Sequence, residues 1–320
     1  RCADLLAEIL LDPDITNGKF NEKNTELEKQ YLLDTIDAEI NDKRTYATIR
    51  CKDVMCAEEL CSIKKYGYRE DAMKITPESA AKAYEELLRT ARVEIMFEGC
   101  GDPTLAKDIF AQKFAGVKRE PIVLSKSLVK AQRGAVKEET ERMDVKQGKL
   151  VMGFRVEGIE DYRRMNMARI TFALFGGTAN SLLFKNVREK MSLCYYCSSG
   201  YDRSNSIMMV SSGVEAENAQ KARDEVLHQL EMLKNGEFTD RELEETKLFI
   251  RTALMATSDS LGAMDSWYLA QTVGGSEVSP DMEIELSAQV SREDVIWVAN
   301  HTHLDTVYML RPNENQKEAE

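Results

Sequence analysis

Arg188 and Tyr195 carry useful binding chemistry and have six residues between them in the central part of the chain. A guanidinium presents a planar fork of donors that suits carbonyl and carboxylate oxygens. A phenol hydroxyl donates one hydrogen bond. The ordinary alternative is an arginine in a surface salt bridge and a tyrosine in a half-buried sheet. The elements around the two residues decide which description applies.

A helix is predicted just before Tyr195, and it carries Arg188. Gly176–Gly177 end the preceding element, because paired glycines lower helix propensity and free the backbone. Thr178 is a fair N-cap candidate. From there to about Met191, apolar residues recur every four positions and predict an amphipathic helix: Leu183, Val187 and Met191.

A short strand follows this helix. Residues 193–199 are rich in aromatic side chains and bounded by Ser192 and Gly200. Alternation along a strand places Tyr195 on one face with Leu193 and Cys197, while Tyr196 points the other way. Arg188 and Tyr195 are therefore expected on either side of one tight helix-to-strand turn.

This pattern resembles the C-terminal homologous domain of the pitrilysin family of zinc peptidases, the inverzincins, which include insulin-degrading enzyme and the mitochondrial processing peptidase. The shared features are glycines before a helix, an arginine late in it, six residues, and a tyrosine opening the next strand. The resemblance implies that Arg188 and Tyr195 hold peptide substrate against a zinc site on a different domain. It also implies an α+β fold of two homologous domains, each a mostly antiparallel sheet backed by helices.

An internal repeat supports two domains. Gly18-Lys-Phe20 opens a long charged helix, as Gly236-Glu-Phe238 does later, and Ile75–Ser79 matches Val290–Asp294 in the same order. Residues 116–144 are rich in Lys, Arg and Glu with little apolar periodicity. The prediction is a first domain at 1–120, a linker at 121–144, and a second domain at 145–320 that carries the Arg/Tyr pair.

The first domain is expected to be truncated. The second repeat begins near Lys149, so its counterpart would begin about 70 residues before Arg1. By the resemblance, that portion would carry the inverted zinc motif His-x-x-Glu-His, whose histidines bind zinc and whose glutamate activates the metal-bound water.

The family's third zinc ligand is a glutamate seven residues after an earlier one on the long helix. Aligned from Glu28, that position falls on Thr35, whose neutral hydroxyl is a poor zinc ligand. A slipped register would place Asp34 or Glu39 there instead. We expect no metal on this chain, and by the resemblance zinc belongs to a partner subunit.

The other metal-binding or nucleophilic residue types are interpreted as structural. The chain has three histidines, and His301-Thr-His303 is expected at a helix C-terminus. Three cysteines stand five apart and would not cluster on a helix: Cys51, Cys56 and Cys61. Cys194 and Cys197 are three apart on a predicted strand, so they are expected on opposite faces.

Composition excludes some function classes. The net charge of −12 opposes nucleic-acid binding, which needs a basic footprint. No apolar run is long enough to cross a membrane. Seven cysteines without a disulfide spacing pattern favour a reducing, cytoplasmic setting.

The resulting hypothesis is a non-catalytic subunit that completes the peptide-binding chamber of a zinc-bearing partner, in a heterodimer or a homodimer. Two alternatives stay open. The chain could be part of an active zinc endopeptidase whose motif lies upstream of Arg1, or a structural relative like the core subunits of a respiratory complex.

Overall fold

A computed structural model describes residues 1–123 and 134–313. Contacts within the chain divide it into two compact units, Arg1–Glu39 with Ile63–Lys126 and Ile40–Ser62 with Ser127–Glu320. The expected first domain at 1–120 is thus interrupted, because residues 40–62 pack with the second unit. The expected linker at 121–144 also includes a strand, β3 (Lys137–Met143), while its residues 124–133 lie outside the described part.

The second unit is built on one five-stranded sheet with the order β3-β7-β4-β6-β5. Its other strands are β4 (Gly148–Val156), β5 (Cys194–Asp202), β6 (Ile207–Val214) and β7 (Thr302–Pro312). Only β3 and β7 run parallel, and the other neighbours are antiparallel. The predicted α+β class, with a mostly antiparallel sheet backed by helices, is confirmed for this unit.

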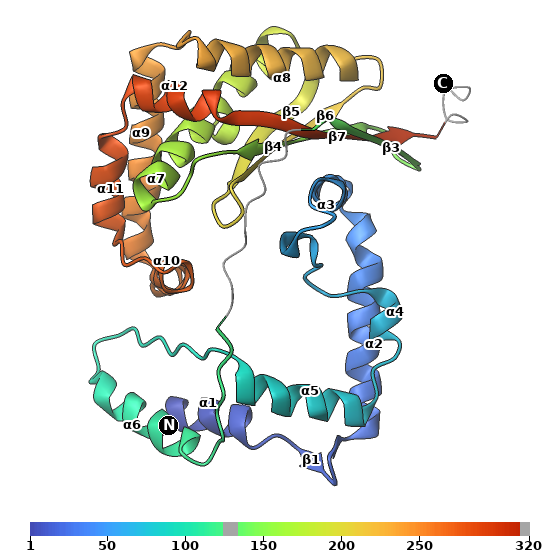
Figure 1. The fold of residues 1–320 in the computed structure, drawn as a ribbon, viewed down its shortest axis with the longest axis vertical. Coiled ribbons are helices and arrows are strands. Elements are labelled where there is room, and N and C mark those ends of the chain that lie inside the picture. The colour runs from blue at the N-terminus through green and yellow to red at the C-terminus, as the bar shows by residue number, and fades with distance from the viewer. Residues whose placement is uncertain (124–133, 314–320) are drawn as a thin grey trace. The chain divides into compact units, whose positions relative to one another are not determined.

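Helices lie along one side of this sheet (Figure 1). They are α7 (Tyr162–Phe172), α8 (Ala219–Lys234), α9 (Asp240–Met255), α11 (Pro280–Ala288) and α12 (Arg292–Asn300), with α10 (Leu261–Gly274) joining α9 to α11. Their apolar stripes and the alternate residues of β4 form the main core, which includes Leu150, Met152 and Phe154. Burial of this apolar surface is the chief favourable term in folding the unit.

The opposite face of the sheet is covered by α3 (Lys43–Met55), which contacts β4 and β7 (Figure 1). A second apolar cluster forms there from Ala47 and Cys51 of α3 with Val151 and Tyr308 of the sheet. Because successive strand residues point to opposite faces, Val151 faces α3 while its neighbours face the main helices. Both faces of β4 are therefore covered, which explains why nearly all of its residues are buried.

The first unit consists mainly of helices: α1 (Cys2–Leu11), α2 (Glu22–Ala38), α4 (Arg69–Ala72), α5 (Pro77–Thr90) and α6 (Pro103–Phe114). A hairpin of β1 (Ile15–Thr16) and β2 (Lys19–Phe20) precedes α2. Thr76 caps α5 in a reciprocal capping box, with Pro77 as the first helical residue. The sequence predicts this start, with Thr76 as N-cap and Pro77 as the first helical residue, and the prediction is correct.

The sequence also predicts a strand at Val93–Phe97, and this prediction is wrong. Among the described residues, no strand pairs with this segment, whose backbone is irregular. A strand needs a neighbour for its N–H and C=O groups, so β-type residues alone do not produce one. Ile95 and Phe97 are consequently exposed, at 47% and 45%.

Within residues 1–123 and 134–313, no helix combines the length and apolar character needed to cross a bilayer.

Candidate peptide-binding site

The helix-to-strand turn that carries Arg188 and Tyr195 is wider than predicted. Two π-helical segments, Ala173–Gly177 and Phe184–Lys190, replace a regular α-helix here. One short helical stretch, residues 182–183, precedes the second segment, and the helix therefore begins after Ser181 rather than after Thr178. The Ser181 hydroxyl accepts the Phe184 N–H at 3.4 Å. π-Turns of this kind are rare and are often found at functional sites.

Gly176 brings this helical segment against β5. A Cβ at that position would lie 2.7 Å from the backbone nitrogen of Ser199 and 2.8 Å from a Leu183 methyl group. Only glycine fits at such a separation, and the preceding helical segment ends at Gly177, as the paired glycines predicted. The chain then leaves the second π-segment through Ser192, whose φ of 51° is left-handed.

Arg188 lies at the surface on the last turn of the second π-segment. Its guanidinium stacks over the Phe184 ring with its central carbon 4.6 Å from the ring centre. Within the described part of the chain, no carboxylate forms an ion pair with Arg188. Phe184 and Arg188 are four residues apart, a spacing that predicts a common helix face, and the stacking is consistent with it, while Arg188 is exposed to solvent.

Tyr195 is 66% exposed, whereas Leu193 and Cys197, predicted to share its face, are buried. The reason is a bulge: Cys194 pairs with Val214 and Tyr196 with Gly213, leaving Tyr195 without a register partner. A bulge inserts one residue and shifts the phase of the alternation. The predicted common face is therefore wrong, and the phenol points to solvent.

Tyr196 is held differently from its neighbour. The Arg44 guanidinium of α3 lies over its ring at 4.2 Å, and Arg44 also donates to the Ser198 hydroxyl at 2.9 Å. The Tyr196 hydroxyl is buried without a hydrogen-bond partner among the described residues, and burial raises its pKa. Contacts with α3 therefore hold β5 beside the exposed Tyr195.

Thr35 does not fit a zinc site. It is exposed on α2, and its hydroxyl donates to the Tyr31 carbonyl at 2.7 Å. Asp34, the slipped-register candidate, accepts from the Gln30 side chain at 2.7 Å, and Glu39 lies at the helix end. The first unit contains no histidine. The residues at hand thus lack the nitrogen and carboxylate set that zinc requires.

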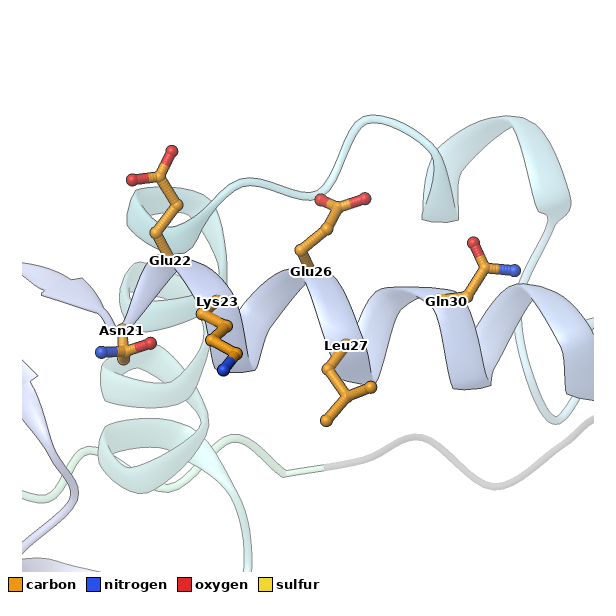
Figure 2. A pocket seen from close by; sticks show the side chains of 6 residues that line it. All are labelled: Asn21, Glu22, Lys23, Glu26, Leu27 and Gln30. Atoms are coloured by element: carbon orange, nitrogen blue, oxygen red, sulfur yellow. The ribbon is translucent and has the colours of Figure 1, made fainter.

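A shallow hollow of about 840 Å³ lies over the start of α2 (Figure 2). It is lined by Asn21, Glu22, Lys23, Glu26, Leu27 and Gln30. Glu22 and Glu26 extend from the same side of the helix (Figure 2), as expected for residues four apart. Thr35 lies outside this lining, so the hollow does not reconstruct the expected ligand position.

Cys56, Glu59 and Cys61 place their ligand atoms within 4.8 Å of one another. The expectation that these cysteines stay apart is wrong for Cys56 and Cys61, because α3 ends before Cys56 and the chain turns back. Cys51 stays on the helix against Val151. Glu59 already binds the buried Arg155 guanidinium, whose positive charge opposes a cation. The group is thus poorly suited to a metal.

The predicted separation of Cys194 from Cys197 is also wrong. Their partners on β6 are Val214 and Ser212, which are two apart and so lie on one face. The bulge at Tyr195 brings both cysteines to that face. No periodicity in the sequence marks this bulge.

His301 is the C-cap residue of α12, as the sequence suggested. Its Nδ1 lies 2.8 Å from the Trp297 carbonyl oxygen, and its ring stacks on Trp297 with centroids 3.9 Å apart. His303 Nε2 is 4.0 Å from a Glu157 oxygen. These contacts account for both rings by local packing and pairing.

The second unit is thus a mostly antiparallel sheet backed by helices, with Arg188 and Tyr195 exposed at one helix-to-strand turn. Residues 74–248 match the peptidase M16 inactive domain, and this match spans more than half of the chain. The chain therefore belongs to the peptidase M16 family. The predicted relationship to a zinc-peptidase family is confirmed, with an inactive peptidase-like domain.

Individual relatives agree with this assignment. The chain is 27% identical over 310 residues to a Bacillus subtilis protein named "Probable inactive metalloprotease YmfF", covering 97% of this chain and 72% of the relative. A conserved Enterococcus faecalis protein superposes with a TM-score of 0.88 at 24% identity, covering 98% and 74%. A peptidase M16 inactive domain from Pseudomonas fluorescens gives 0.80 at 20%, covering 98% and 75%. The two structural likenesses show the shared fold.

Proposed function

We propose that this chain is a non-catalytic subunit that supplies Arg188 and Tyr195 to peptide bound at the zinc site of a partner chain. The observation that carries the proposal is the contrast between two positions. Arg188 and Tyr195 are both exposed at one helix-to-strand turn. The Thr35 hydroxyl, in contrast, donates a hydrogen bond to the Tyr31 carbonyl. The chain thus has two exposed side chains that can bind substrate, and a residue poorly suited to bind zinc at the third ligand position.

The two side chains have distinct tasks in this proposal. The Arg188 guanidinium forks onto substrate carbonyl or carboxylate oxygens and fixes the register of the peptide. The Tyr195 hydroxyl donates a hydrogen bond to the oxygen that becomes negatively charged in the transition state, an interaction that strengthens when water is excluded. Neither role requires zinc on the same chain.

The partner is a zinc-bearing family member in a heterodimer, or a second copy of this chain as a homodimer. A cytoplasmic location is part of the proposal and rests on the odd number of cysteines, seven. The alternative of an active enzyme predicts about one equivalent of tightly bound zinc in the full-length protein. The alternative of a purely structural subunit predicts no peptide cleavage with any partner.

The test is cleavage of a fluorogenic peptide by the chain mixed with the zinc-bearing family member of the same organism. Tyr195→Phe is expected to lower turnover by about 10²-fold with little change in KM, because it removes one transition-state donor. Arg188→Ala is expected to raise KM as well, because its contacts form already in the ground state.

Tyr196→Phe is the matched control, because that hydroxyl is buried without a partner and faces away from substrate in this proposal. It is expected to retain wild-type turnover. Sedimentation confirms that each variant still binds the partner. Wild-type rates in both Arg188→Ala and Tyr195→Phe, with the complex intact, would remove the assigned roles.

A further inference from the structure

The bulge at Tyr195 creates a pair of thiols that the proposed peptide-binding role does not use. We propose that Cys194 and Cys197 form a reversible redox dithiol. Cys194 reacts first with a low-molecular-weight disulfide, and Cys197 then resolves the mixed disulfide to give a Cys194–Cys197 bond. The proposal concerns the chemistry of this chain alone and holds whether or not Arg188 and Tyr195 bind peptide.

Strand register places the two sulfurs together. Cys194 pairs with Val214 and Cys197 with Ser212 across β5 and β6. Both partners lie on one face, so the cysteines occupy neighbouring positions on that face despite their three-residue separation. Cys197 belongs to the main core, and Cys194 packs against the same core. In a regular strand the same spacing would direct the thiols apart, which makes the bulge the cause of the pair.

Access to the two thiols is unequal, as a two-step exchange requires. Cys194 is partly exposed, whereas Cys197 is 3% exposed. A small disulfide can therefore reach Cys194 from solvent but not Cys197. Cys197 reacts only with a sulfur already delivered beside it, which favours internal closure over a second adduct.

The surroundings of Cys194 also favour its thiolate. Hydrogen bonding with the Cys197 thiol and the nearby positive charge of Arg188 outweigh burial and lower the pKa of Cys194 to about 7. The same shared hydrogen bond and burial raise the pKa of Cys197 well above its usual value. The thiolate is the nucleophile in disulfide exchange, so these effects select Cys194 as the attacking group.

The other thiol pair of the chain provides an internal contrast. Cys56 and Cys61 also lie close together, but burial and a hydrogen bond with Cys61 raise the pKa of Cys56 to about 12. The Glu59 carboxylate adds a repulsive charge beside a Cys56 thiolate. The two pairs thus differ in the direction in which their surroundings shift the pKa of the first thiol.

The reaction balances with oxidised glutathione as the oxidant. The Cys194 thiolate attacks one glutathione sulfur, a Cys194–glutathione bond forms, and the first glutathione leaves as a thiolate. The Cys197 thiol then loses its proton to solvent and attacks the Cys194 sulfur, which releases the second glutathione thiolate. Two cysteines are oxidised and one glutathione disulfide is reduced to two thiols.

The experiment treats the full chain with oxidised glutathione at neutral pH, quenches with acid and N-ethylmaleimide, and maps each cysteine by mass spectrometry. The wild type is expected to give the Cys194–Cys197 disulfide and little lasting adduct on Cys194. Cys197→Ser is expected to accumulate the Cys194–glutathione adduct, because the resolving thiol is gone. Cys61→Ser is the matched control and is expected to leave the products at Cys194 unchanged.

Rates give a second criterion. Iodoacetamide is expected to modify Cys194 about tenfold or more faster than Cys56 at neutral pH, because thiolate fraction controls the rate. The proposal is overturned if Cys194 stays reduced while the exposed Cys2 and Cys100 acquire glutathione. Should Cys197→Ser fail to fold, phenylarsine oxide on the wild type decides: joint protection of both thiols supports the pair, and absence of protection overturns it.

Discussion

Arg155 is a buried charged residue of the second unit, and a buried charge is stable only when it is paired and hydrogen-bonded. It lies in β4 and is 1% exposed. Its Nη2 is 2.5 Å from a Glu59 oxygen and 2.9 Å from the Met55 carbonyl oxygen, and its Nε is 2.8 Å from Asp305. Burial alone would lower the pKa of Arg155, but the hydrogen bonds and charges of Glu59 and Asp305 raise it above its usual range.

Replacing Arg155 by methionine keeps an unbranched side chain, although a shorter one, and removes every donor. Glu59 and Asp305, whose side chains are only 10% and 4% exposed, then lose their compensating charge. Removing one member of a buried ion pair costs about 3–5 kcal/mol, a large part of a typical stability of roughly 5–15 kcal/mol. We expect the urea midpoint of this unit to fall by about 1–2 M.

Tryptophan fluorescence is a suitable assay, because both tryptophans, Trp267 and Trp297, belong to the second unit. The control is a triple variant that adds Glu59→Gln and Asp305→Asn to Arg155→Met. It is expected to recover most of the loss, because uncharged partners no longer need the cation. A loss below about 1 kcal/mol in the single variant, or no recovery in the triple one, would refute this reasoning.

Three other predictions address the site and its scaffold. Gly176→Ala places a Cβ 2.7 Å from a backbone nitrogen of β5 and is expected to destabilise the second unit by about 1–3 kcal/mol; Gly262→Ala, whose Cβ would make only an ordinary contact with the Ser260 hydroxyl at 3.9 Å, is the control and melts no lower than wild type. Because a hydrogen bond from Cys197 lowers the pKa of Cys194 to about 7, its alkylation rate rises with pH and is expected at half its plateau near pH 7; a midpoint near pH 9 would contradict this. Thr239→Ala removes the capping box of α9 and is expected to cost about 1 kcal/mol in urea unfolding; an unchanged midpoint would show that the cap contributes nothing.

Features that depend on interactions within a few residues, such as helix starts, could be predicted from the sequence. Thr76 with Pro77 marked the start of α5, and Gly236-Glu-Phe238 marked the start of α9. Gly18 and Gly236, matched in the predicted repeat, both have left-handed φ, 75° and 73°. The repeat itself stays a prediction, as do the homologous domains drawn from it.

Features that depend on contacts between distant parts of the chain could not be predicted from the sequence. The bulge at Tyr195 comes from pairing with β6, and nothing in the alternation of residues 193–199 signals it. The docking of α3 on the far face of the sheet depends on β4 and β7, which come about 100 and about 250 residues later in the chain. The strand predicted at Val93–Phe97 does not form for the same reason, because a strand needs a neighbouring strand for its backbone hydrogen bonds.

The place of β7 in the sheet has a consequence for synthesis. β7 lies between β3 and β4, yet it follows all the other strands in the sequence. A ribosome adding about 5–20 residues per second needs roughly 5–20 s to travel from the end of β6 at Val214 to the end of β7 at Pro312. During that interval β3 has no partner and β4 has an open edge, a state prone to wrong pairing. Synonymous codon changes that slow translation between β6 and β7 are therefore expected to lower the soluble yield without altering the finished protein.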